Sequence, residues 1–158
     1  MGTTRVATTW PRVAAALAAV LGVTVLGGCT TTETCVDWVA YDDDEARIAD
    51  SDLVADVRVV ERDGTEEMFG YEANAWTVEV DDVVSPLDDT DIRTGDRLRV
   101  VATPVTCSEA SYPDGDPLDV DGVVRVYLRD AGASGTDGIA DGSWSLITPY
   151  DGVGPVEG

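Results

Sequence analysis

The chain has 158 residues, enough for one domain with a single hydrophobic core. Its formal charge is −21, and because it contains neither histidine nor lysine, all ten of its basic residues are arginines. Nucleic acid repels so acidic a chain, and the commonest general base and zinc ligand is missing. Composition therefore excludes a nucleic-acid-binding protein and leaves carboxylates as the main remaining route to catalysis.

The first 28 residues have the layout of an export signal. Arg5 and Arg12 come first, an apolar run follows from Val13 to Leu26, and the first acidic residue is Glu33. The run is about 14 residues long, whereas a helix that spans a bilayer needs roughly 20. We therefore expect residues 1–28 to be a cleaved signal helix; the alternative is a permanent N-terminal helix.

The apolar run ends in Leu26, Gly27 and Gly28, directly before Cys29. This sequence resembles the lipobox of bacterial lipoproteins, in which the cysteine is lipidated on sulfur and becomes the mature N-terminus. The resemblance implies an exported protein that is held by lipid on Cys29 at the extracytoplasmic side of the cell membrane, since two acyl chains anchor a protein firmly. Removal of residues 1–28 takes away two arginines and no acid, so the formal charge becomes −23.

Two cysteines remain, Cys35 and Cys107, and an exported chain meets oxidising conditions. We expect them to form a disulfide, with two free thiols as the alternative. The bond would close a loop of about 70 residues and stabilise the fold by roughly 4 kcal/mol in the chain-entropy model. Residues 29–34 are then the lipidated cysteine and a tether that reaches at most about 17 Å. Residues 35–158 are expected to form a single domain.

Residues 42–49 predict a short helix, because Asp42 to Asp44 offer an N-cap and place negative charge at its start. After the helix, apolar residues alternate with polar ones in five runs, as in half-buried strands. These runs lie at residues 53–59, 76–81, 97–102, 124–129 and 143–148. Turn residues bound them at Asp63-Gly64, Ser85-Pro86, Thr94-Gly95-Asp96, Asp114-Gly115 and Asp141-Gly142. The pattern predicts a mainly β fold, a small five-stranded barrel with one short helix, because closure removes exposed strand edges.

This succession of strands is similar to an OB-type barrel. The sequences ADSDLV, WTVEVDDVV and TGDRLRVV, followed by a cysteine, resemble the netrin-like form of that barrel, which includes metalloprotease inhibitors. In that group a disulfide ties an N-terminal segment to a later strand or loop, and the resemblance gives this part to Cys35 and Cys107. The inhibitors grip zinc through the amine of an N-terminal cysteine; here Cys29 would carry lipid, so that mechanism is not implied. The sequence WSLITPYDGV at residues 144–153 resembles a family of actinobacterial lipoproteins, a likeness that implies no activity.

The segment 114–121 is the best candidate for a specific site. Calcium requires hard oxygen ligands, and the segment offers carboxylates at Asp114, Asp116, Asp119 and Asp121. The spacing is not that of an EF-hand, because Pro117 and Leu118 interrupt it and no glutamate closes the loop. The alternative is a polar loop between two strands. A second acidic patch, at residues 88–91, is expected to be a solvated turn.

The large aromatic residues are expected to be structural. Trp76 and Trp144 fall on apolar strand positions and should lie in the core, whereas Trp38 and Tyr41 should pack the N-terminal segment onto the barrel. A surface platform for a ligand is the alternative use of such residues.

Together these features favour an exported, membrane-anchored lipoprotein with a non-enzymatic binding or structural β-domain. Its expected partners are the membrane, through Cys29, and an envelope or extracellular protein, with no cofactor and no nucleic acid. The first alternative is a calcium-dependent surface or adhesion component that uses residues 114–121. The second is a carboxylate-based hydrolase.

Overall fold

The computed structural model describes residues 33–85, 91–132 and 138–156. The expected signal segment, Cys29 and most of the acidic patch at residues 88–91 lie outside these ranges. Within the described ranges, no helix has both the length and the apolar character needed to cross a membrane.

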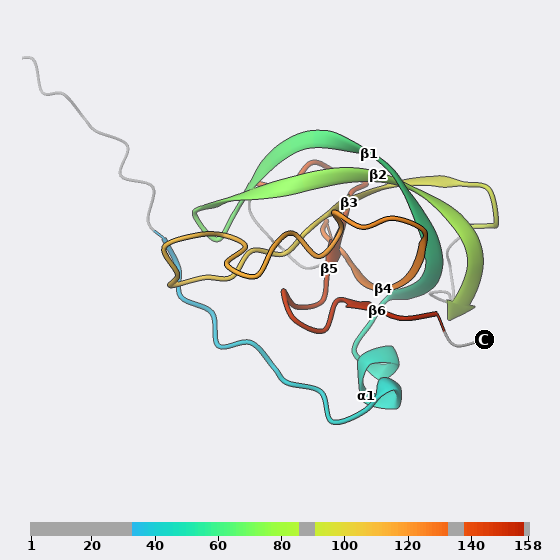
Figure 1. The fold of residues 1–158 in the computed structure, drawn as a ribbon, viewed down its shortest axis with the longest axis horizontal. Helices are drawn as coiled ribbons and strands as arrows, with labels where there is room; N and C mark the ends of the chain where they lie inside the picture. Colours follow the sequence, from blue (N-terminus) through green and yellow to red (C-terminus); the bar gives the residue numbers. More distant parts are fainter. Residues whose placement is uncertain (1–32, 86–90, 133–137, 157–158) are drawn as a thin grey trace, which may run out of the picture. The chain divides into compact units, whose positions relative to one another are not determined.

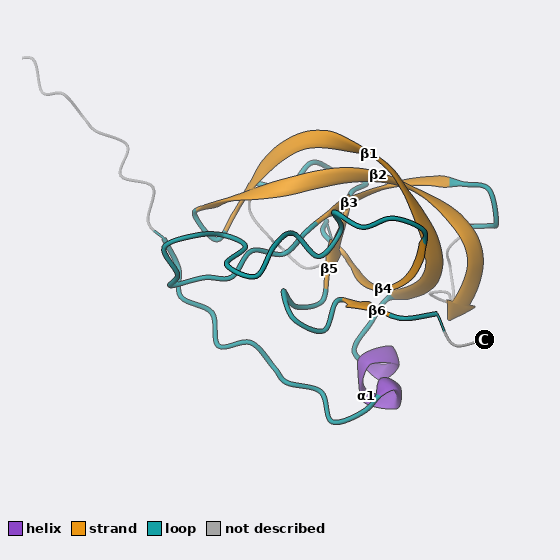
Figure 2. Ribbon diagram, in the orientation of Figure 1, coloured by secondary structure: helices purple, strands orange, loops and turns teal. Residues whose placement is uncertain are grey.

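One short helix and six strands make up the described fold (Figure 1, Figure 2). In chain order they are α1 Asp44–Ala49, β1 Leu53–Met68, β2 Tyr71–Ser85, β3 Arg97–Val101, β4 Val123–Asp130, β5 Trp144–Leu146 and β6 Val153–Gly154. All six strands belong to one sheet in the order β1-β2-β3-β5-β4-β6, and β1 also pairs with β4, so five strands form a ring. The β3–β5 pairing is parallel and the others are antiparallel. The expectation of a mainly β fold with one short helix is confirmed.

Helix α1 begins directly after its N-cap residue, Asp43. The carboxylate of Asp43 accepts a hydrogen bond of 2.8 Å from the amide of Ala46, which satisfies one of the helix's unpaired N–H groups. Asp44 in the first turn forms an ion pair with Arg47 in the last, at 3.2 Å. The helix therefore starts at Asp44 rather than at residue 42. Its Ile48 packs against a small cluster on the outer side of the ring, formed by Val54, Tyr127 and Ile147.

Strand β1 is longer than the sequence predicts. The expected boundary at Asp63-Gly64 is wrong, because the strand continues to Met68 and pairs with β2 along its whole length. Gly64 has a φ of +81° and lies at a register shift between Arg62 and Thr65, where β1 carries one residue more than β2. The glycine's conformational freedom thus serves a β-bulge, which bends a strand without ending it.

The core fills the inside of the ring. Inward residues of five strands form one cluster of buried residues, which also includes Leu118 from the segment between β3 and β4. Trp76 and Trp144 are half-buried and pack against this cluster, as the sequence predicts. At the start of β1 the run from Leu53 to Val57 is buried on both faces, because the ring interior covers one face and the outer cluster with the Asp56–Arg125 pair covers the other.

Candidate functional site

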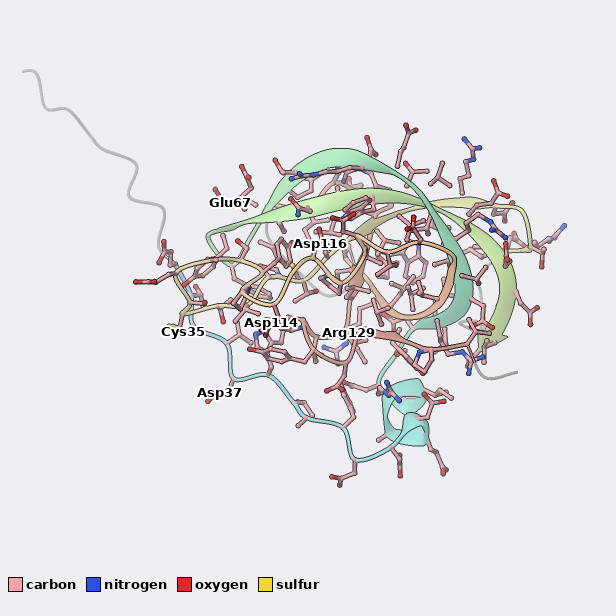
Figure 3. The ribbon with its side chains drawn as sticks, viewed as in Figure 1. Cys35, Asp37, Glu67, Asp114, Asp116 and Arg129 are labelled. Atoms are coloured by element: carbon pink, nitrogen blue, oxygen red, sulfur yellow. A yellow bond between two sulfur atoms is a disulfide. The ribbon has the colours of Figure 1, made fainter. Side chains whose placement is uncertain are left out.

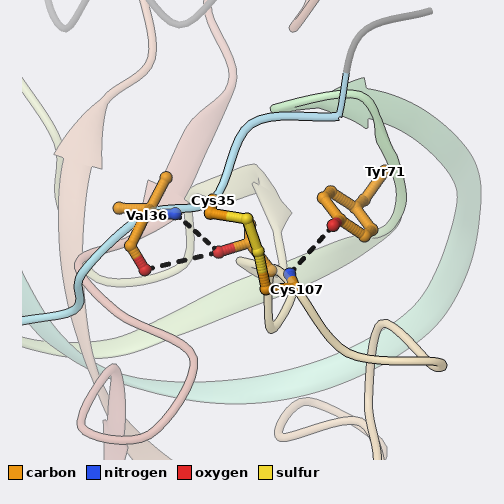
Figure 4. Close-up of a disulfide and its surroundings, with 5 residues drawn as sticks. Cys35, Val36, Tyr71 and Cys107 are labelled. Atoms are coloured by element: carbon orange, nitrogen blue, oxygen red, sulfur yellow. Dashed lines mark hydrogen bonds between the residues drawn. A yellow bond between two sulfur atoms is a disulfide. The ribbon is translucent and has the colours of Figure 1, made fainter.

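Among the described residues, Cys35 of the N-terminal segment meets Cys107 of the segment between β3 and β4 (Figure 4). Cys35 and Cys107 lie at disulfide distance, with their Cα atoms 5.3 Å apart, which agrees with the expected disulfide. A hydrogen bond beside the disulfide joins the same two segments, since the amide of Val36 donates to Thr106 Oγ1 at 2.9 Å. The amide of Cys107 donates to Tyr71 Oη at 2.8 Å and so attaches the β3–β4 segment to β2. The pair thus ties the N-terminal segment to the segment between β3 and β4.

We call residues 33–40 the strap, because this segment runs along the ring without joining the sheet (Figure 1). Its Thr34 amide donates to the carbonyl of Phe69 at 2.9 Å, and its Trp38 ring meets the Phe69 ring edge-on at 5.6 Å. Figure 3 shows Cys35 and Asp37 on the strap. Trp38 therefore packs this segment against the β1–β2 turn, while Tyr41 beyond the strap packs on the outer cluster with Val54, as expected.

The loop between β3 and β4 is fastened over the ring by Asp116. Its carboxylate accepts hydrogen bonds from Asn74 Nδ2 at 2.6 Å, from Trp76 Nε1 at 3.0 Å and from the amide of Leu118 at 2.9 Å. Leu118 is fully buried in the core. One carboxylate therefore holds the loop in the position that lets Leu118 close the end of the core.

Tyr112 makes a second attachment of the same loop. Its hydroxyl donates to the carbonyl of Ala102 at 2.6 Å and accepts from the amide of Asn74 at 2.8 Å. Burial raises the pKa of Tyr112 well above its ordinary value, so the phenol keeps the proton that it donates.

These contacts change the interpretation of the predicted calcium ligands. Asp116 turns inward onto β2, whereas Asp114, Asp119 and Asp121 are exposed to solvent. Among the described residues, no group of three or more acidic or cysteine side chains lies close enough to hold a metal ion. The geometry thus favours the alternative of a structural loop.

Carboxylate chemistry would draw on a buried acidic group, and among the described residues that group is Asp56. Its partner is a cation: Arg125 Nε donates to Asp56 Oδ1 at 2.8 Å and Arg125 Nη2 donates to Oδ2 at 3.2 Å. Hydrogen bonding to Asp56 raises the pKa of the Arg125 guanidinium above its ordinary value, even though its burial acts in the opposite direction. The pair joins β1 to β4, whose residues 56 and 125 face each other in the register.

No protein-family model matches the chain, and neither does a curated protein or a solved structure.

Among the depressions of the described surface, two differ in chemical character. The larger, of about 290 Å³, lies at the end of the β1–β2 hairpin and carries three glutamates; its lining is Thr65, Glu66, Glu67, Gly70, Tyr71 and Glu72. The smaller, of about 30 Å³, is lined mainly by prolines and tyrosines, among them the exposed Tyr150; its lining is Val105, Tyr112, Pro113, Asp114, Gly115, Pro117, Pro149 and Tyr150. Glu66 already forms an ion pair with Arg99. The first depression presents negative charge, and the second a mostly apolar and aromatic surface with the carboxylate of Asp114 beside it.

The C-terminal sequence at residues 144–153 has a structural role. A Cβ atom at Gly152 would lie 2.6 Å from both Leu146 Cβ and the carbonyl oxygen of Thr148, so the chain can turn this tightly only with glycine. The amide of Asp151 donates to Thr148 Oγ1 at 2.9 Å and closes the turn. The sequence predicts the strand at Trp144 but neither this turn nor the strand β6 after it, because a strand of two residues is too short to show a period.

Proposed function

We propose that this protein is an exported lipoprotein, anchored through Cys29 to the outer side of the cell membrane. The arrangement of the three cysteines carries the proposal. Cys29 follows an apolar run and two glycines, while Cys35 and Cys107 lie at disulfide distance. Disulfides persist in oxidising compartments, so the pair supports export, and it leaves Cys29 as the cysteine available for lipid.

The β-domain is proposed to be a non-enzymatic binding module for an envelope or extracellular protein. The five-stranded ring supports the resemblance to OB-type barrels, which are also five-stranded and bind their ligands on the barrel face and adjoining loops. The pairing of Asp56 with Arg125 supports a structural role for the buried carboxylate. The depression around Tyr150 offers the apolar surface that protein partners favour at the centre of an interface.

Lipidation is tested with the full chain, expressed in a bacterium that processes lipoproteins. We expect the membrane fraction to hold a protein that begins at Cys29 and carries the mass of a diacylglycerol on that residue. The Cys29→Ser variant should lack this mass and keep residues 1–28. Cys35→Ser is the matched control, since it removes a thiol six residues later and should leave lipidation intact. An unmodified thiol at Cys29 in membrane-bound protein would contradict the anchor.

The binding role is tested by cross-linking in intact cells. The anchored protein is compared with a control in which residues 1–34 carry an unrelated exported domain. We expect one envelope or extracellular protein to be enriched by the native ring and lost in the Tyr150→Asp variant. Equal capture by the control and the native chain would show that the ring does not bind.

A further inference from the structure

The strap is attached to the ring at few points. Its residues are mostly exposed, and Val39 has 58% of its surface open to solvent. None of the hydrophobic clusters formed by the described residues includes a residue of the strap. Apart from the disulfide, its hydrogen bonds to the ring are those of Thr34 with Phe69 and of Val36 with Thr106, among the described residues. The core of the ring is therefore complete without it.

The attachment points carry unfavourable backbone conformations. Of the described residues other than glycine, two have a positive φ: Phe69 at 57° and Cys107 at 58°. Both are contact points of the strap, one through the Trp38 ring and the other through the disulfide. Side chains with a Cβ are disfavoured in this region, and the surroundings must offset the cost. Trp38 of the strap adds a further energetic cost to the attachment, because its indole N–H is buried without a hydrogen-bond partner.

A second attachment follows the strap and does not depend on the cysteines. The Tyr41 hydroxyl donates a hydrogen bond to Asp50, and its ring packs on the outer cluster with Val54 and Tyr127. With the disulfide formed, residues 30–34 separate Cys29 from the ring and reach at most about 17 Å. With the strap released, the separating residues are 30–40, which reach about 37 Å.

We propose that the Cys35–Cys107 disulfide is a redox clasp, which sets how far the ring can stand from the membrane. This inference rests on the proposed lipid anchor at Cys29. When the disulfide is formed, it holds the strap against Phe69 and Cys107, which adopt strained backbone conformations, and the ring stays close to the bilayer. When the disulfide is reduced, the strap dissociates from the ring and the tether roughly doubles in reach. Phe69 then loses its contact with the Trp38 ring.

The reductant is an exported protein dithiol, and the exchange balances in two steps. A thiolate of the reductant attacks one sulfur of the Cys35–Cys107 bond and forms a mixed disulfide, while the other cysteine leaves as a thiolate and takes a proton. The second thiol of the reductant then resolves the mixed disulfide, and the second cysteine takes a proton. Two electrons pass to the pair, and the reductant ends as a disulfide. Cys35 and Cys107 are both exposed, so either sulfur can be approached.

Release of the strap is tested by hydrogen exchange on the full, lipidated chain, with dithiothreitol as the probe reductant. After reduction we expect the amides of Thr34 and Val36, the strap amides that donate to the ring, to exchange at the rate of an unstructured chain. Residues 53–57 and 123–130 should stay at least about a hundredfold slower than that rate. The Cys107→Ser variant should show the same pattern without reductant, while Val39→Ala, a change at an exposed strap position, should behave as the native protein. The clasp is refuted if the strap stays protected after reduction, or if the strands lose their protection together with it.

The change in reach is measured separately, by neutron reflectometry of the lipidated protein on a supported bilayer. Reduction should move the protein layer outward by up to about 20 Å. A layer whose height stays the same in both redox states would overturn the inference about reach. A chain that forms no layer on the bilayer would refute the lipid anchor instead, and the exchange experiment would still decide whether the strap is released.

Discussion

The carboxylate of Asp116 accepts the indole N–H of Trp76 at 3.0 Å, across 40 residues of sequence. Together with its bonds to Asn74 and to the amide of Leu118, this contact fixes the β3–β4 loop against β2. An aspartate that the sequence offers as a candidate calcium ligand is thus a structural acceptor. The loop's position, and with it that of Leu118 in the core, depends on this residue.

The variant Asp116→Asn should lower the free energy of unfolding by about 1–2 kcal/mol. Whichever way the new amide turns, its NH₂ group faces at least one protein donor that now lacks an acceptor. Chemical denaturation measures the change. Asp119→Asn is the matched control, because Asp119 is exposed, and it should change stability by less than about 0.5 kcal/mol. Equal effects of the two substitutions would contradict the role assigned to Asp116.

Period-two patterns place the five longer strands because one side of each faces the core. They fail where tertiary structure uses a turn signal differently: Asp63-Gly64 has the composition of a hairpin turn, yet Gly64 lies in a bulge and the chain turns at Phe69-Gly70. Nothing local distinguishes the two uses of glycine, since both need a positive φ.

The candidate site also contains one feature that the sequence predicts and one that it does not. The pairing of Cys35 with Cys107 follows from counting cysteines once Cys29 is set aside, and the structure places the two together. The inward turn of Asp116 could not be predicted, because two of its three donors, Asn74 and Trp76, come from β2, about 40 residues earlier in the chain. Sequence composition describes the charge of a loop but not which carboxylate meets a buried donor.

Replacement of Leu118 should open a cavity in the core. The side chain is fully buried, so Leu118→Ala should lower the free energy of unfolding by about 3 kcal/mol through lost burial and an unfilled cavity. Val120→Ala, two residues later in the same loop, serves as the control, because Val120 has 38% of its surface exposed. A small effect at Leu118, similar to that at Val120, would mean that the loop does not close the core.

Removing one partner of the buried Asp56–Arg125 pair should lower the free energy of unfolding strongly, whereas replacing both partners with apolar residues should change it little. Arg125→Met leaves a buried carboxylate without its partner and should destabilise the protein by about 3 kcal/mol. The double variant Asp56→Leu with Arg125→Met should return to within about 1 kcal/mol of the native protein, because both charges are gone.

The matched control for that pair is Arg58→Met, which removes an ion pair with Asp81. The Arg58 side chain has 54% of its surface exposed, so the loss should stay below about 1 kcal/mol.

If the double variant of Asp56 and Arg125 is no more stable than Arg125→Met alone, the guanidinium contributes by packing rather than by its charge.

Reduction of the disulfide should lower the melting temperature while the ring remains folded at 25 °C. Cys35 and Cys107 are 72 residues apart, and the chain-entropy model gives a loss of about 4 kcal/mol when such a link is removed. Cys35→Ser should have the same effect as the reductant, and Cys29→Ser should have none. A melting temperature that responds to neither change would refute the disulfide.

Stability should fall at high pH because of the tyrosines on the outer side of the ring. Burial, with hydrogen bonds to Asp50 and Asp44, raises the pKa of Tyr41 and of Tyr127 from 10.0 to about 12. Between these values the unfolded chain loses the phenolic protons that the folded protein keeps, so the free energy of unfolding falls as the pH rises from about 10 to about 12.

The phenol of Tyr127 can be tested alone by comparing Tyr127→Phe with the native sequence. Both should carry Cys29→Ser, so that no free thiol exchanges with the disulfide at alkaline pH. Tyr112 also has a raised pKa, and so Tyr127→Phe should make the fall of stability with pH shallower by roughly a third. Urea unfolding at pH 9 and at pH 11 measures the two slopes. Identical slopes would mean that Tyr127 loses its proton in the folded protein as readily as in the unfolded chain, so that its hydrogen bond to Asp44 does not hold the proton.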